Sequence, residues 1–129
     1  MADPEFLDDD DAEWSRHTGG SGHDGREWGP EDGDLAAAFH ASLNGKSKSL
    51  FDLFVDHPGR RLTTHEITEL LPELTNPHSI AASLSSLAKP REEAERQFPF
   101  RWWKGDGAST PTRYAMKTSV SRLFAAARN

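Results

Sequence analysis

Residues 60–88 read RRLTTHEITELLPELTNPHSIAASLSSLA and contain the signals for two consecutive short helices. Thr63 and Glu66 have the spacing of a capping box, in which each side chain bonds to a backbone amide of the other residue. This spacing predicts a helix within residues 62–71. Pro72 ends it after little more than two turns, because proline cannot continue the helical hydrogen-bond pattern.

The second helix of this stretch is predicted over residues 77–88. Asn76 is a favourable capping residue, and Pro77 suits the first helical position because its missing amide would have no partner there. Apolar residues then recur at helical spacing, as expected for a helix that buries one face. They are Ile80, Leu84 and Leu87. The stretch therefore predicts two helices joined by a tight turn.

Upstream of this pair, two further helices are predicted over residues 34–44 and 47–57. Asp34 can cap the first, and Gly45 supplies its stop. The second carries a stripe of apolar residues and ends before Pro58. The chain thus enters the pair of short helices from a longer amphipathic one.

Downstream, residues 98–117 alternate between two faces and predict a β-hairpin, with Gly105 and Gly107 in the turn. The alternation places Trp102 among the aromatic residues that face the helices. Trp103 lies on the opposite face, where we expect it to pack on the amino-terminal helix, to stack on a base or to join a dimer contact.

A final amphipathic helix is predicted from Thr118 or Ser119 onward. The expected fold class is mainly α with a small β-hairpin, an α+β protein with an extra helix at each end.

This order of elements resembles the winged helix-turn-helix fold over residues 46–117. The strings DHPGRRLTTHEITELL, PFRWW and RYAM, followed by a helix that ends AAAR, resemble small actinobacterial winged-helix proteins of a family with no assigned function. The resemblance implies a DNA-binding transcriptional regulator. Its helix 77–88 would enter the major groove, and its basic wing, residues 98–117, would contact phosphates.

Candidate DNA contacts follow from that placement. Helix 77–88 is rich in serine, and only Asn76, at its cap, is of a type that reads a base with two hydrogen bonds. The basic residues around the helix would bind phosphates, which supplies affinity with little sequence information. The candidates are Arg60, Arg61, Asn76, His78, Ser79, Ser83, Ser86, Lys89, Arg91, Arg101, Lys104 and Arg113.

The alternative function is a protein–protein interaction adaptor that keeps the winged-helix fold without reading DNA. Small serine side chains allow close approach to another protein, which favours this alternative. A homodimer is also plausible, because the first and last helices carry more apolar surface than a minimal domain requires. The residues expected at that contact are Phe39, Leu43, Leu123 and Phe124.

Charge is distributed unevenly along the 129 residues. Residues 1–45 contain two basic and twelve acidic side chains, a net charge of −10, whereas residues 46–129 contain thirteen basic and nine acidic ones, a net charge of +4. This asymmetry points to a polyanionic partner or to an internal electrostatic switch. On a flexible tether, the acidic segment could occupy the basic surface and compete with phosphate. A role in solubility alone is the other interpretation.

We expect residues 1–33 to be an unstructured acidic arm and residues 34–129 to be the folded domain. The arm has too few aliphatic residues to offset its ordering entropy. Residues 1–6 resemble translated cloning-site codons. Trp14 and Trp28 are expected to be solvated, with docking on a partner or on the domain as the alternative.

Several classes of protein are not expected. The chain has no cysteine, which excludes disulfides, thiolate metal sites and cysteine nucleophiles. His65 and Glu69 lie one helical turn apart, but such pairs are common on protein surfaces. We expect no enzyme activity, no cofactor and no metal. No apolar stretch is long enough to cross a bilayer, and we expect a cytoplasmic protein.

Overall fold

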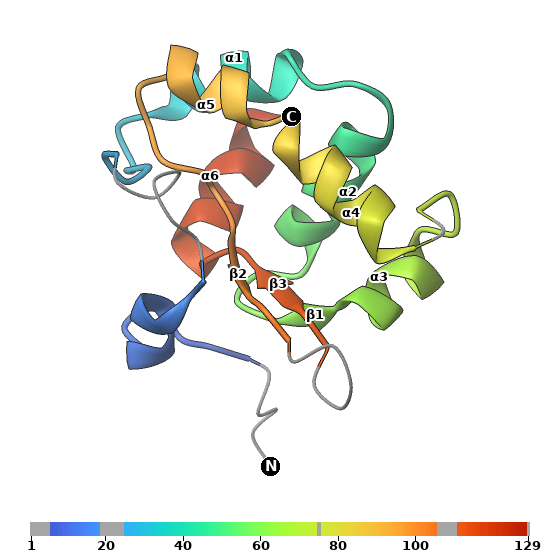
Figure 1. The fold of residues 1–129 in the computed structure, drawn as a ribbon. Helices are drawn as coiled ribbons and strands as arrows, with labels where there is room; N and C mark the ends of the chain where they lie inside the picture. Colours follow the sequence, from blue (N-terminus) through green and yellow to red (C-terminus); the bar gives the residue numbers. More distant parts are fainter. Residues whose placement is uncertain (1–5, 19–24, 75, 106–110, 129) are drawn as a thin grey trace.

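The computed structural model describes residues 6–18, 25–74, 76–105 and 111–128, apart from the side chain of Pro77. Helices lie above and beside a small antiparallel sheet (Figure 1), so the α+β class is confirmed. The elements in chain order are the 3-10 helix η1 (Ala12–Arg16), α1 (Gly33–Ala41), α2 (Gly45–Asp56), β1 (Leu62–Thr63), α3 (Thr64–Leu70), α4 (Pro77–Ser85), α5 (Ala88–Glu93), β2 (Arg101–Trp103), β3 (Arg113–Ala115) and α6 (Thr118–Ala127).

The starts of α3 and α4 have the capping interactions that the sequence predicts. The Glu66 amide donates to Thr63 Oγ1, and the Thr63 amide donates to Glu66 Oε1, both at 3.1 Å. At α4, the Ser79 amide donates to Asn76 Oδ1 at 2.9 Å. Because the caps satisfy backbone donors that have no partner within the helix, they fix where each helix begins.

The sheet has three strands in the order β1-β3-β2. The hairpin of β2 and β3 was predicted, but β1 was not. Its two residues precede α3 in extended conformation, and Leu62 pairs with Tyr114, which also pairs with Trp102. The chain that leads into α3 is thereby attached to the hairpin.

The main core lies between α1, α2, α4 and α6, above the sheet in Figure 1. The Phe124 ring packs edge to face on Phe51 and Trp28, with ring centroids 4.8 and 5.0 Å apart. Phe39, Leu43 and Phe124 are buried in this core, and Leu123 is half-buried. The expected dimer contact therefore loses three of its four residues to internal packing. Dimerisation itself stays a prediction.

The predicted helix 77–88 is shorter than expected, because α4 ends at Ser85 and a separate short helix, α5, begins at Ala88. In one continuous helix, residue 90 would donate its amide to the carbonyl of Ser86. Pro90 has no amide proton, so it cannot make that bond, and it lies instead in the first turn of α5. The Ser86 hydroxyl bonds to the Ser83 carbonyl at 2.6 Å, which competes with the backbone at the end of α4.

The expectation that the two tryptophans of the arm are solvated is wrong, because both are buried. Trp28 belongs to the main core, where its Nε1 donates to the Gln97 carbonyl at 2.9 Å. Trp14 belongs to a second, smaller cluster. Trp14 is part of η1, which lies beside the hairpin on the side away from α4 (Figure 1). The members of this smaller cluster are Leu7, Trp14, Trp103 and Ala115.

The two hairpin tryptophans therefore have different surroundings from those predicted. Trp103 is buried, with its ring centroid 5.6 Å from that of Trp14. It packs on η1 and not on the helix predicted over residues 34–44. Trp102 is only partly buried, although the alternation placed it in the core.

Candidate nucleic-acid interface

The outward face of α4 carries short side chains. His78, Ala81, Ala82 and Ser85 are exposed, and Asn76 is occupied by its capping bond. Ser79 is half-buried next to that cap. None of these side chains can form the bidentate contacts by which arginine or lysine recognises guanine. This face is thus suited to close approach and has little capacity for base reading.

Ser83 and Ser86, two candidate DNA contacts, lie on the side of α4 that meets α2. The hydroxyl of Ser47, in α2, lies 2.6 Å from the Ser86 hydroxyl and donates to the Ser83 carbonyl at 3.0 Å. These residues hold two helices together, a role that the sequence pattern did not indicate.

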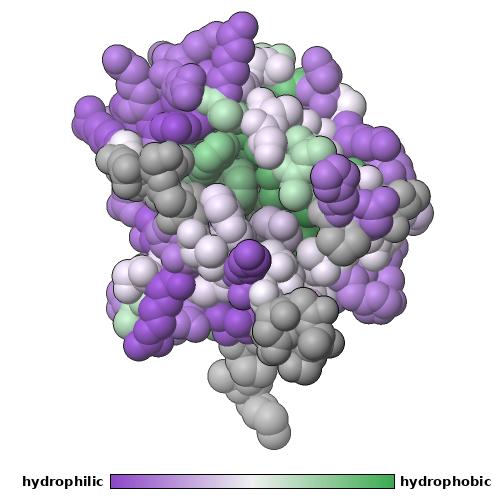
Figure 2. Space-filling model, in the orientation of Figure 1, coloured by the Kyte–Doolittle hydropathy of each residue, from purple (hydrophilic) through white to green (hydrophobic). Residues whose placement is uncertain are grey.

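A groove of about 290 Å³ separates α4 from the hairpin. Apolar residues predominate in its lining, and Figure 2 shows a hydrophobic area near the middle of the corresponding face. The lining residues are Ala81, Leu84, Ser85, Phe98, Phe100, Trp102 and Tyr114. The groove is open to solvent, and it joins the exposed side of α4 to the inner face of the sheet.

The two arginines before α3 are both held by carboxylates. Arg60 forms an ion pair with Glu66 at 3.0 Å. Arg61 forms one with Glu13 of η1 at 3.1 Å, and its guanidinium lies over the Trp103 ring at 5.3 Å from the centroid. The Arg61 side chain is only 8% exposed. Arg61 is therefore covered by the arm, whereas Arg60 stays partly accessible.

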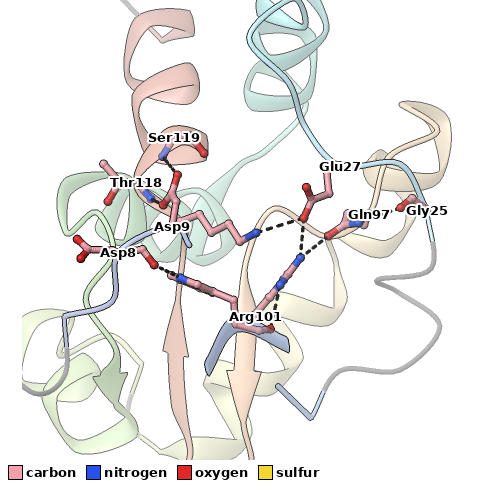
Figure 3. A network of polar contacts seen from close by, with 10 residues as sticks. Asp8, Asp9, Gly25, Glu27, Gln97, Arg101, Thr118 and Ser119 are labelled. Atoms are coloured by element: carbon pink, nitrogen blue, oxygen red, sulfur yellow. Dashed lines mark hydrogen bonds and ion pairs between the residues drawn. The ribbon is translucent and has the colours of Figure 1, made fainter. Parts of the chain in front are cut away.

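Arg101, on the outer face of β2, is surrounded by acceptors from distant parts of the chain (Figure 3). Its guanidinium pairs with Glu27 at 2.9 Å and also donates to the Trp14 carbonyl and to Gln97 Oε1. The same Glu27 oxygen accepts from Lys117 Nζ at 3.3 Å. One carboxylate thus neutralises two cations at the open end of the hairpin, one at the start of β2 and one after the end of β3.

A third carboxylate from the arm lies at the start of α6. The amides of Thr118 and Ser119 donate to the two oxygens of Asp9 at 2.7 and 3.0 Å, and Figure 3 shows this carboxylate directed at both residues. Burial acts to raise the pKa of Asp9, but hydrogen bonds from Ser119 and Thr118 outweigh it and hold the pKa below its ordinary value. The positive end of the α6 dipole favours the same charged form.

Carboxylates from the arm therefore hold this surface at several points. Hydrogen bonding to Arg16, opposed by burial and reinforced by Arg61, keeps the pKa of Glu13 below its ordinary value. The neighbouring His17 has its pKa lowered by burial and by the charges of Arg101 and Lys117. We call this region, formed by Arg61, Arg101, Lys117 and the first amides of α6, the cationic face.

The remaining basic candidates surround the hairpin and α5. Lys89 and Lys104 are exposed, and the Lys104 amide donates to Thr18 Oγ1. The Arg91 guanidinium lies over the Phe98 ring at 5.2 Å. Arg113 is half-buried and faces Trp103 across the hairpin. Of these four residues, Arg91 contacts a residue that lines the groove, and Arg113 lies on the same face of the hairpin as Trp103.

Sequence reasoning missed four residues of the cationic face and its cover, namely Asp9, Glu13, Glu27 and Lys117. The charge asymmetry predicted that the acidic segment could meet the basic domain. It could not identify pairs, because Glu27 and Arg101 are separated by 74 residues.

His65 and Glu69 form an exposed pair, with 3.0 Å between Nε2 and Oε1. Among the described residues, no three histidine or acidic side chains come together as a potential metal site. In the same part of the chain, no helix has both the length and the apolar character needed to cross a bilayer.

Comparison with known proteins gives one match. Residues 33–129 match the model of DUF6416, a family of unknown function. No curated protein and no solved structure matches the chain. The matched range begins at α1, so the segment that covers the cationic face lies outside it.

Proposed function

Because this chain belongs to DUF6416, a family of unknown function, its activity has to be argued from the site, and we propose that it binds double-stranded DNA as a winged-helix transcriptional regulator. The order α2, β1, α3, α4, β2, β3 and the strand order β1-β3-β2 support a winged helix-turn-helix. In this proposal α3 and α4 form the helix-turn-helix pair, and the hairpin is the wing.

The observation that carries the proposal is the chemistry of the cationic face. This face binds three carboxylates of the arm. Glu13 binds Arg61, Glu27 binds Arg101 and Lys117, and Asp9 binds the first amides of α6. Phosphate oxygens accept hydrogen bonds from the same donor types, including helix N-termini. A surface that binds several carboxylates has the chemistry required to bind a phosphate backbone.

Binding is expected to depend more on phosphate contacts than on base sequence. The exposed residues of α4 are short, and Arg60, Lys89 and Lys104 remain accessible as further cations. Phosphate-dominated binding weakens steeply with salt, by roughly 10³-fold or more between about 50 and 200 mM for a protein that makes six or more phosphate contacts.

The test is fluorescence anisotropy of the full chain with a labelled random-sequence duplex over this range of salt. Lys104→Gln should weaken binding and reduce the salt slope by about one phosphate contact. Lys48→Gln removes the same charge from an exposed position of α2, outside the hairpin, and serves as the matched control. Equal effects of the two variants would remove the wing from the interface.

The groove between α4 and the hairpin supports a second candidate function, an adaptor that binds an apolar segment of a partner protein. Its aromatic lining beside small exposed residues is suited to an inserted apolar side chain. Ala81→Glu would place a charge in the groove, whereas Ala82→Glu would place it on an exposed position outside the lining. Peptides selected from a random library on the wild-type chain should lose binding to the first variant only.

A further inference from the structure

We infer that residues 6–18 form an autoinhibitory segment whose carboxylates occupy the cationic face in place of DNA phosphates, and that the segment leaves when DNA binds. This inference rests on the proposed function, because DNA is the ligand that would displace the segment. Residues 6–18 are called the N-terminal strap below.

The strap contacts the cationic face through charged and polar groups. Glu13 pairs with Arg61, and Asp9 accepts from the first amides of α6. The carbonyl of Trp14 accepts from Arg101 at 2.9 Å. Each of these strap oxygens is bound to a donor that could bind a phosphate oxygen instead.

Backbone contacts hold the strap along the sheet. The Leu7 amide donates to the Gly59 carbonyl at 2.7 Å, and the Thr18 amide donates to the Trp102 carbonyl at 2.6 Å. The Trp103 indole donates to the Glu13 carbonyl at 3.2 Å. The strap therefore covers the outer face of the hairpin from β2 to the loop before β1.

The strap can leave without opening the main core, because its apolar contacts form a separate cluster of four residues. Only two of these, Leu7 and Trp14, come from the strap itself. A cavity of about 140 Å³, lined in part by Asp9, Trp14 and Lys117, lies between the strap and the domain. That volume is large enough for several water molecules, so the strap and the domain are not in full contact there.

Residues 25–32 do not belong to the detachable segment. Trp28 is part of the main core, and Asp32 is buried against Arg96. Removal of the whole predicted arm, residues 1–33, would therefore damage the domain as well as expose the cationic face. The inference requires a test in the full-length chain.

The test compares two charge-matched variants of the strap. Asp9→Asn with Glu13→Gln removes two charges that contact the cationic face. Asp8→Asn with Asp10→Asn removes two charges from exposed neighbours in the same segment. DNA affinity is measured by anisotropy with random-sequence duplex at low salt, and near-ultraviolet circular dichroism verifies folding.

We expect the first variant to bind DNA roughly fivefold or more tightly than the second, because it loses the Glu13–Arg61 ion pair and the charge of Asp9 at the first amides of α6. Hydrogen exchange on the wild-type chain provides the second measurement. Addition of DNA should accelerate exchange of the Leu7 and Thr18 amides, because both are bonded to the domain only while the strap is docked.

The outcomes separate the two proposals. Equal gains in affinity for the two variants would show a long-range charge effect and overturn the inference. DNA binding with the Leu7 and Thr18 amides still protected would also overturn it, while the proposed function would stand. If neither the wild type nor the two variants bind DNA, the proposed function is rejected. Displacement of the strap by DNA is then rejected as well.

Discussion

Arg96 forms a two-point ion pair with Asp32, with its Nη2 2.9 Å from Oδ1 and its Nε 3.0 Å from Oδ2. The two residues are 64 positions apart, and the pair joins the start of α1 to the segment after α5. Hydrogen bonds from Arg96 and from the Gly29 amide, opposed by burial, lower the pKa of Asp32 to about 2. This pair fixes residues that the sequence assigned to an unstructured arm.

Asp32→Asn should lower the free energy of unfolding by about 1–3 kcal/mol, the range for loss of charge-assisted hydrogen bonds to a buried group. Because the folded-state pKa is depressed, the stabilisation is complete above the ordinary value of 3.8 and is lost as pH falls towards 2. Urea unfolding at pH 7 and at pH 2.5 measures both effects. Asp34→Asn, which changes an exposed residue in the first turn of α1, is the control. An equal loss of stability in this variant would show that the Asp32–Arg96 pair is not the cause.

Trp28→Ala and Trp14→Ala should differ sharply, because the two side chains belong to different clusters. Truncation of a large aromatic residue in the main core costs roughly 3–5 kcal/mol. Trp14→Ala should instead release the strap and leave the denaturant midpoint of the domain nearly unchanged. Equal shifts of the two midpoints would mean that the strap and the core unfold together.

Gly59→Ala should weaken docking of the strap. Gly59 has a φ of +76°, and a Cβ there would lie 2.8 Å from the Leu7 carbonyl oxygen and 2.9 Å from Thr118 Oγ1. Alanine is strained at this φ, at a cost of roughly 1 kcal/mol or more, and the contacts offer it no space. Hydrogen exchange of the Leu7 amide reports the effect. Gly33→Ala, where a Cβ meets nothing within 4 Å, should leave that amide protected.

Acidification should release the strap before the domain unfolds. The pKa values of Asp9 and Glu13 are held below 3.8 and 4.5, so their contribution to docking is present above these values and declines as pH falls through the lowered ones. The protection factor of the Thr18 amide, which compares its exchange with that of an unfolded amide at the same pH, should therefore fall below about pH 4. A protection factor that stays constant down to about pH 3 would show that carboxylates do not hold the strap.

Glu27→Gln should increase DNA affinity, because Glu27 neutralises both Arg101 and Lys117 and is not part of the strap. The Glu27 side chain is 60% exposed, so we expect a gain of a few-fold, as for an ordinary surface ion pair. Glu31→Gln breaks the pair with Arg26 and removes the same charge. An equal gain for that variant would mean that only net charge matters.

The sequence predicted the parts of the fold that depend on local signals. The capping interactions of Thr63 and Asn76 are determined within four residues, and the hairpin follows from alternation of apolar and basic side chains. Strand β1 escaped prediction because two residues carry no period. The early end of α4 was missed because Ser86 and Pro90 act together at a boundary that the apolar stripe crosses.

The carboxylates that occupy the cationic face could not be predicted, because their contacts join residues that are distant in sequence. Low aliphatic content made residues 1–33 look unable to fold, yet Trp28 enters a core built by α1, α2 and α6. Likewise, Ser83 was assigned to the DNA side, and its true neighbour, Ser47, is known only once α2 packs on α4. Helical periodicity identifies the buried stripe of a helix. It does not show which other helix packs against the remaining residues of that helix.

The position of Trp103 against Trp14 also provides an optical signal of strap docking. Two indoles with centroids 5.6 Å apart exchange excitation energy, and departure of Trp14 would expose Trp103 to water. Replacement of Trp28 and Trp102 by phenylalanine would leave emission from this pair alone. The molecule then reports the occupancy of its own cationic face without any attached dye.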